Sequence, residues 1–209
     1  TTESGTYSFS NVPAGTYTIQ ASKDGYTSAT SQSVTVESAD VTDTNLTLSL
    51  IKYNVYVNGT QVTGLNKGNV LASDTNNSGK VSYTPAGEGT PAKLTLSGVN
   101  LTSSGISTSE PLVIELQANT TNTISVSGHA INMHQDTSSS KPAPLEITGT
   151  GTLNVTGSSQ SSTLYAYGDV TINGGANVTA INTNTGLGDA LDLTQHHLTI
   201  SGDGTTLLA

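Results

Sequence analysis

The chain of 209 residues contains no cysteine and no arginine, and aromatic residues make up only 4% of it. Without cysteine, neither a disulfide framework nor thiol chemistry is available. No run is apolar enough to span a membrane, and no signal peptide or sorting tail is recognisable. Six lysines stand against fifteen acidic residues, and the net charge of −9 disfavours nucleic acid, phosphate and anionic lipid as ligands.

Threonine, serine, asparagine and glycine dominate instead, and only 10% of the residues are charged. Such a composition can indicate disorder, but apolar residues alternate with polar ones between turn signals, which indicates β structure. A polar, weakly charged β surface is typical of extracellular proteins. We therefore expect an extracellular or cell-surface location, with no nucleic-acid partner and no membrane insertion. The abrupt ends of the chain indicate a mature or excised fragment.

A repeat organises the last third of the chain. Three short apolar-alternating strands each end near a glycine turn, and their isoleucines Ile147, Ile172 and Ile200 lie 25 and then 28 residues apart. A second strand follows each of them, and a third lies between repeats. A period of this size, built only from strands and turns, is the signature of a β-solenoid. The predicted fold is all-β, a right-handed parallel β-helix with three sides.

The alternation also predicts which side chains are buried, because successive residues of a strand point to opposite faces. The expected interior residues are Leu145, Ile147, Leu153, Val155, Ile172, Leu191 and Ile200. The expected outward residues are Glu146, Thr171, Asp192 and Thr199. The same alternation places Asn132, Tyr165 and Asp192 in one row on an outer face, at equivalent positions of successive coils.

Residues 1–50 are interpreted as a separate small β unit, with strands expected at 5–9, 16–21, 33–36 and 45–48. Its motifs are Gly5-Thr-Tyr-Ser-Phe, Val12-Pro-Ala-Gly-Thr-Tyr and Lys23-Asp-Gly-Tyr. These motifs resemble the carboxypeptidase regulatory-like (transthyretin-like) β-sandwich, whose first two strands are absent. The resemblance implies a spacer or adhesion module with no catalytic residues. It implies an incomplete β-sandwich that precedes the solenoid and that earlier chain or a partner strand completes.

Residues 51–209 are predicted to form the solenoid, with 51–92 as its N-terminal cap and 93–209 as its coils. Four motifs stand out: Tyr53-Asn-Val-Tyr-Val-Asn-Gly, Lys93-Leu-Thr-Leu-Ser-Gly-Val, Tyr167-Gly-Asp-Val-Thr-Ile-Asn-Gly-Gly and Gly188-Asp-Ala-Leu-Asp-Leu. They resemble a bacterial β-helix carbohydrate-binding domain of clostridial surface proteins, which is similar in fold to pectate lyases. The resemblance implies binding of plant-type polysaccharide.

Some members of that family hold calcium through aspartates at corner turns, and the matching positions here are Asp169 and Asp189. Oxygen ligands at such turns suit Ca²⁺, although turn aspartates also bond local backbone. In the third repeat, Thr194-Gln-His-His stands where the Gly-Asp turn would be. The histidines His129, His134, His196 and His197 are interpreted as polar corner residues, because nothing completes a zinc site.

Catalysis is not expected. A lyase of the pectin type needs a cationic base, and beyond Lys93 the only cation is Lys141, in a loop. A glycosidase needs two carboxylates roughly 5–9.5 Å apart across a cleft. Alternation points Asp189 and Asp192 to opposite sides of a strand, and no aromatic-walled cleft is evident.

Polysaccharide binding is the favoured function. Tyr165 and Tyr167 are the only aromatic residues of the coils, and a tyrosine ring can stack on a sugar. Alternatively, Tyr165 packs on the sheet surface and Tyr167 seals a corner. The predicted carbohydrate site comprises Asn132, Tyr165, Tyr167 and Asp192, with the insertion from His134 to Pro144 as a wall. A second hypothesis is a structural stalk or fibre subunit that self-associates end to end.

Overall fold

The computed structural model describes residues 5–77, 79–135, 141–193 and 195–209. These residues form strands and turns but no helix, so none of them belongs to a helix that could cross a membrane. The prediction of an all-β chain is therefore confirmed. The chain divides into two compact units, the first ending at Ile51 and the second beginning at Lys52.

The first unit contains two small antiparallel pairs. β1 (Gly15–Tyr17) pairs with β4 (Val34–Val36), and β2 (Gln20–Ala21) pairs with β3 (Ala29–Thr30). The strands expected at 5–9 and 45–48 are not formed, so that prediction was wrong. No described residue up to Ile51 is buried, and Phe9 is 68% exposed. Two-stranded pairs without a buried face are marginally stable. The segments before β1 and after β4 make isolated contacts instead of strands, such as the hydrogen bond from the Tyr7 hydroxyl to the Thr44 carbonyl and the single bridge between Tyr26 and Leu50.

Three sheets build the second unit. The first sheet has the order β19-β16-β13-β10-β5-β6, the second β20-β17-β14-β11-β8-β7, and the third β21-β18-β15-β12-β9. The first sheet contains β5 (Lys52–Val57), β6 (Thr60–Thr63), β10 (Ile106–Thr108), β13 (Ile131–Met133), β16 (Leu164–Ala166) and β19 (Leu191–Asp192). The second contains β7 (Lys80–Thr84), β8 (Ala92–Ser97), β11 (Leu112–Leu116), β14 (Leu145–Thr148), β17 (Val170–Ile172) and β20 (Leu198–Ile200). The third contains β9 (Asn100–Leu101), β12 (Thr121–Ser125), β15 (Thr152–Gly157), β18 (Asn177–Asn182) and β21 (Thr206–Leu208).

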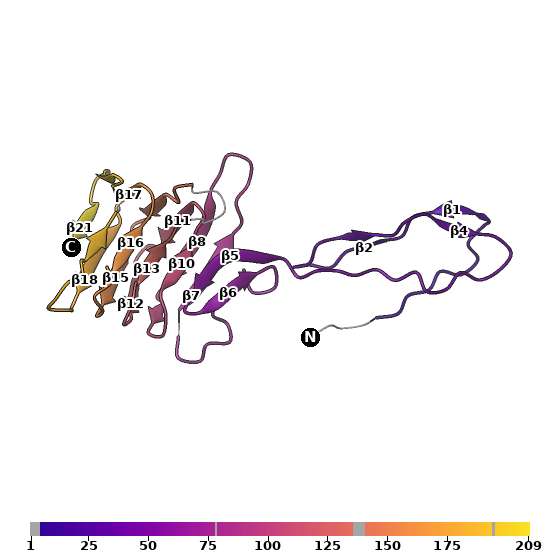
Figure 1. The fold of residues 1–209 in the computed structure, drawn as a ribbon, viewed down its shortest axis with the longest axis horizontal. Helices are drawn as coiled ribbons and strands as arrows, with labels where there is room; N and C mark the ends of the chain where they lie inside the picture. Colours follow the sequence, from indigo (N-terminus) through magenta and orange to yellow (C-terminus); the bar gives the residue numbers. More distant parts are fainter. Residues whose placement is uncertain (1–4, 78, 136–140, 194) are drawn as a thin grey trace. The chain divides into compact units, whose positions relative to one another are not determined.

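From β8 onwards the chain visits the second, third and first sheets in turn (Figure 1). From β8 to β18, each strand pairs in parallel with the strand three places further on in the sequence, as β8 does with β11 and β11 with β14. Ile114, Ile147 and Ile172 stand in register on three adjacent strands although the circuits between them differ in length, 33 and then 25 residues. The turns between strands take up this difference, so equivalent residues still meet.

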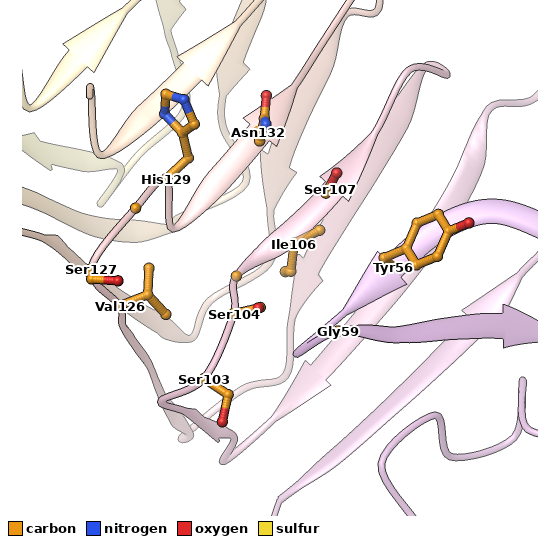
Figure 2. A pocket seen from close by; sticks show the side chains of 12 residues that line it. Tyr56, Gly59, Ser103, Ser104, Ile106, Ser107, Val126, Ser127, His129 and Asn132 are labelled. Carbon is orange, nitrogen blue, oxygen red and sulfur yellow. The ribbon is translucent and has the colours of Figure 1, made fainter. Parts of the chain in front are cut away.

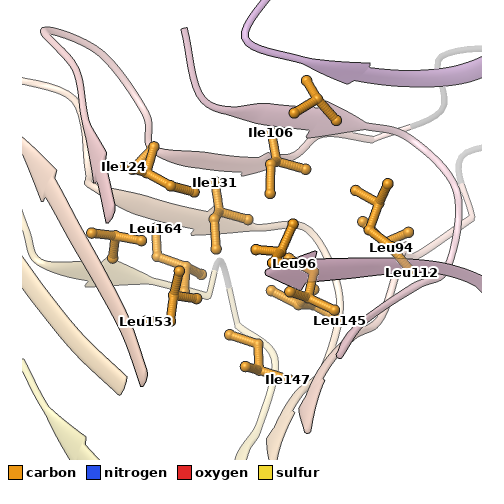
Figure 3. Packing of buried hydrophobic residues seen from close by; sticks show 14 of the residues in the cluster. Leu94, Leu96, Ile106, Leu112, Ile124, Ile131, Leu145, Ile147, Leu153 and Leu164 are labelled. Carbon is orange, nitrogen blue, oxygen red and sulfur yellow. The ribbon is translucent and has the colours of Figure 1, made fainter. Parts of the chain in front are cut away.

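The inward faces of the three sheets share one core (Figure 3). Leu145, Ile147, Leu153, Val155 and Ile172 are at most 1% exposed, as the alternation predicts. Two predicted interior residues differ: Leu191 is only half-buried, and Ile200 is 46% exposed. Both lie on strands at a sheet edge, β19 and β20, so no neighbouring strand covers their far side.

The outward residues also differ in degree from the prediction. Thr199 is exposed, whereas Glu146, Thr171 and Asp192 are only half-exposed. Glu146 and Thr171 lie on adjacent strands in direct register, and side chains from neighbouring strands shield one another at this spacing. The position of a residue in its strand therefore determines which face of the sheet it lies on, whereas the side chains of neighbouring strands determine its exposed fraction.

The cap predicted at 51–92 corresponds to antiparallel strands at one end of the first and second sheets. β5 pairs antiparallel with both β6 and β10, and β7 pairs antiparallel with β8. Eight of its side chains belong to the core: Val55, Val57, Val62, Val70, Leu71, Val81, Tyr83 and Ala92. Antiparallel strands thus occupy the end where a further parallel coil would otherwise stack.

Tyr83 in this cap gives a prediction about alkaline pH. The side chain is 5% exposed, and burial, with Glu110 and Tyr53 contributing, raises the pKa of Tyr83 from 10.0 to about 12. The folded state therefore keeps a proton that the unfolded chain loses, and stability should fall between pH 10 and 12. The loss due to Tyr83 should be about 2 kcal/mol by about pH 11.5.

Denaturant unfolding of wild type and Tyr83→Phe, at pH 8 and near pH 11.5, measures this effect. The Phe variant should lose less stability between the two pH values. Equal losses in the two proteins would contradict the buried, protonated state of Tyr83.

Candidate functional site

The three residues predicted to form an outer row are in register. Asn132 of β13 pairs with Tyr165 of β16, which pairs with Asp192 of β19. The row continues to Ser107 of β10 and Tyr56 of β5. We call these five residues the outer row: Tyr56, Ser107, Asn132, Tyr165 and Asp192. At about 4.8 Å per strand it extends roughly 19 Å, and Figure 2 shows its Tyr56, Ser107 and Asn132.

Short strands explain why the row is one residue wide. Each of β10, β13 and β16 has three residues, and the first and third of each are buried. Only the middle residue can therefore face outward. The outer face of the first sheet thus presents hydroxyl, amide, aromatic and carboxylate groups in sequence along the stack.

His129 joins this face, which the sequence analysis did not predict. Its ring lies 5.4 Å from the Tyr165 ring, centroid to centroid, with the planes tilted by 39°. Its Nδ1 bonds to the backbone carbonyl of Ser162. These contacts connect the turn before β13 to the following coil, and no local sequence pattern marks such a contact.

Tyr167 lies outside the row, two residues beyond Tyr165. Its hydroxyl accepts a hydrogen bond of 3.0 Å from Nε2 of Gln135, and its ring contacts His196 edge-on at 5.5 Å. The structure therefore does not bring Tyr167 together with the other three predicted residues. The insertion expected to wall the site includes residues 136–140, which lie outside the described residues.

The two aspartates predicted to bind calcium occupy different corners. Asp169 follows β16 and precedes β17, whereas Asp189 follows β18 and precedes β19. Oδ1 of Asp169 accepts the backbone N–H of His197 at 3.0 Å, and this bond is the main reason that the pKa of Asp169 lies below its usual value. The Asp189 backbone carbonyl accepts the N–H of Thr163. In the described part of the chain, no three His, Cys, Asp or Glu side chains gather as a metal site.

A hollow of about 380 Å³ opens beside the Tyr56 end of the row. Figure 2 shows its lining, which the β5–β6 turn, the segment 103–107 and the turn before β13 provide. The lining residues are Tyr56, Gly59, Ser103, Ser104, Gly105, Ile106, Ser107, Val126, Ser127, Gly128, His129 and Asn132. Hydroxyl groups dominate its polar lining, and neither a carboxylate nor a lysine is among these residues.

Asn132 lines the hollow and also belongs to the row. Its Oδ1 is buried and has no hydrogen-bond partner among the described residues. Buried polar atoms are normally paired with protein or water, so this oxygen is an unpaired acceptor at the place where the row meets the hollow. An acceptor beside hydroxyl groups and aromatic rings suits a ligand rich in hydroxyl groups.

The described residues thus form an all-β scaffold whose first sheet has a polar outer face with two tyrosines. A family model described as carbohydrate-binding domain-containing protein matches residues 58–208, which is more than half of the chain. The chain therefore belongs to that family. A model of the carboxypeptidase regulatory-like domain matches residues 1–49. The two family resemblances stated from the sequence are therefore confirmed as to the family. Neither a curated protein nor a solved structure gives a significant match.

Proposed function

We propose that the chain is a non-catalytic, extracellular or cell-surface module that binds polysaccharide along the outer row. The observation that carries the proposal is the register that aligns two tyrosines with hydroxyl, amide and carboxylate groups on one outer face. Tyrosine rings stack on the apolar faces of sugars, while the polar groups between them bond sugar hydroxyls. Membership of a carbohydrate-binding family supports this use of the face.

The spacing of the tyrosines favours an extended ligand. Tyr56 and Tyr165 are three strands apart in the first sheet, which corresponds to about 14 Å. This separation exceeds a single sugar ring, so a chain lying across the strands could contact both. The net charge of −9 and the carboxylate of Asp192 favour a neutral glycan over a polyanionic one. A neutral plant-type polysaccharide meets these requirements.

We infer that the second unit is a right-handed, three-sided parallel β-helix. The parallel pairing of strands one circuit apart supports this architecture, and crossovers between parallel strands are almost always right-handed. Calcium at the turns of Asp169 and Asp189 stays a prediction, and because the two aspartates occupy different corners, each would need further oxygen ligands of its own. The carbohydrate site proposed consists of the outer row.

Tyr165→Ala tests the proposal. The variant should bind polysaccharide about 1–3 kcal/mol more weakly, on the scale of other aromatic stacking contacts, or roughly 5- to 150-fold. Affinity electrophoresis in gels containing neutral glucans, mannans or xylans measures the change. The matched control is Thr171→Ala, a half-exposed outward residue of the second sheet, which should bind like wild type.

A Tyr165→Ala protein that binds every polysaccharide bound by wild type, equally tightly, would overturn the proposal. The stalk hypothesis would then be favoured, since apolar side chains are exposed on the edge strands β20 and β21, where Ile200 is 46% and Leu208 is 66% exposed. Size-exclusion chromatography over a range of concentrations would measure that self-association.

A further inference from the structure

The hollow beside Tyr56 has fixed walls on one side. Asn58 and Gly59 form the β5–β6 turn with φ angles of 50° and 80°, a conformation that Asn-Gly favours in tight hairpins. The Asn58 side chain holds the adjacent loop: its Oδ1 accepts the N–H groups of Ser103 and Ser104 at 3.1 and 3.0 Å. Its Nδ2 donates to Asp74 at 2.9 Å. The turn and the loop are therefore connected by side-chain bonds.

The opposite wall is held as firmly. Gly105 passes so close to the next coil that a Cβ there would lie 2.0 Å from the Ala130 carbonyl oxygen. The imidazole of His129 is fixed by the Ser162 carbonyl and the Tyr165 ring. Pre-formed walls matter for affinity because a ligand then binds without the cost of ordering them.

The chemistry of the lining selects among ligands. Four serines and the Tyr56 hydroxyl offer both donors and acceptors, and the buried Oδ1 of Asn132 is an unpaired acceptor. An anion would find no lysine or arginine in the lining, and a cation would find no carboxylate. The volume of about 380 Å³ lies near the lower end of small-molecule sites. A small, neutral, polyhydroxylated ring fits these properties.

We propose that this hollow is a subsite for one neutral sugar ring, a chain end or a side branch, next to the polysaccharide track of the outer row. This inference rests on the proposed function, because Asn132 and Tyr56 belong to both. The Asn132 amide and the serines bond the hydroxyl groups at the ring's edge, and the Tyr56 ring covers its apolar face. The subsite gives the module a preference for particular ends or branches in addition to its affinity for the chain.

Gly128→Leu tests the subsite by filling it. No atom lies within 4 Å of a Cβ built on Gly128, and its φ is outside the left-handed region, so the leucine enters open space. Gly68→Leu is the matched control, since Gly68 has the same open surroundings but does not line the hollow. Ser127→Phe fills the hollow from an exposed neighbouring position, should Gly128→Leu fail to fold.

The probes are glucose, galactose, mannose and xylose, with galacturonate as a charged comparison, observed by saturation-transfer NMR on the full chain. Wild type and Gly68→Leu should bind at least one neutral monosaccharide. Gly128→Leu should lose at least tenfold in affinity for it, and galacturonate should not bind. The subsite would be overturned if wild type bound none of the neutral monosaccharides, or if Gly128→Leu bound them as tightly as wild type does.

Asp192→Ala separates this result from the proposed function, because Asp192 belongs to the outer row but does not line the hollow, whereas Tyr165 contacts His129, which does. Asp192→Ala should weaken polysaccharide binding while keeping the monosaccharide, whereas Gly128→Leu should lose the monosaccharide and keep most of the affinity for unbranched chains. If the outer-row variant binds polysaccharide as tightly as wild type does, the outer row is not the polysaccharide site. If Gly128→Leu binds the monosaccharide as tightly as wild type does, only the hollow is contradicted.

Discussion

Ile147→Ala should lower the free energy of unfolding of the second unit by about 3–4 kcal/mol. Ile147 is 0% exposed and stands between Ile114 and Ile172, its register partners on either side. Removing three carbons from such a stacked column loses their burial and leaves a cavity, since the backbones of paired strands cannot close together. The effect should be among the largest of any single substitution in the coils.

Ile200→Ala is the matched control for this substitution. Ile200 belongs to the same column, as the partner of Ile172, but it lies on the edge strand β20 and is 46% exposed. Its truncation should cost only about 1 kcal/mol, since nearly half of its surface is already exposed and no enclosed cavity is left. Urea unfolding followed by circular dichroism compares the two variants with wild type. Equal losses for Ile147 and Ile200 would contradict the shared core of the three sheets.

Asn122→Ala should cost about 2–4 kcal/mol through hydrogen bonding instead of packing. Asn122 is 0% exposed although it is polar. Its Oδ1 accepts the N–H of Val99 at 3.2 Å, and its Nδ2 donates to the carbonyl of Thr152 at 3.1 Å. Val99 and Thr152 belong to the coils before and after its own, so one amide connects three coils. Its removal leaves the buried N–H of Val99 and the partly buried carbonyl of Thr152 without this partner.

Hydrogen exchange measures this loss directly, because the amide of Val99 should exchange faster in Asn122→Ala than in wild type. The control is Asn154→Ala on the next strand of the same sheet, where the side chain is half-exposed. That substitution should change stability by no more than about 0.5 kcal/mol. If the Val99 amide exchanges equally slowly in Asn122→Ala and wild type, the hydrogen bonds of the Asn122 side chain do not stabilise the protein.

The alternation of apolar and polar residues was sufficient to predict the interior of the central coils. Leu145, Ile147 and Ile172 are buried as expected because each lies between paired strands on both sides. The prediction failed at Ile200, which has the same pattern but a neighbour on one side only. Alternation identifies the face of a strand, whereas burial also requires something to cover that face.

Asn122 shows a second limit of the pattern. It occupies an inward position two residues before the buried Ile124, yet a polar residue there indicates nothing about its partners. Those partners lie 23 and 30 residues away, on the preceding and following coils. Only the stacking of coils brings them within hydrogen-bond distance.

The candidate site also contains residues that the sequence predicted and residues that only the tertiary structure brings together. Repeat position alone placed Asn132, Tyr165 and Asp192 in one row, because equivalent positions of successive circuits return to the same face of the same sheet, one strand further along the stack. Tyr56 has no equivalent in the repeat, and it joins the row because β5 pairs antiparallel with β10. His129 and the hollow depend likewise on turns from separate segments that meet at a corner. Period and alternation are local properties that a sequence displays, whereas the cap's pairing and the meeting of distant turns are decided by packing in three dimensions.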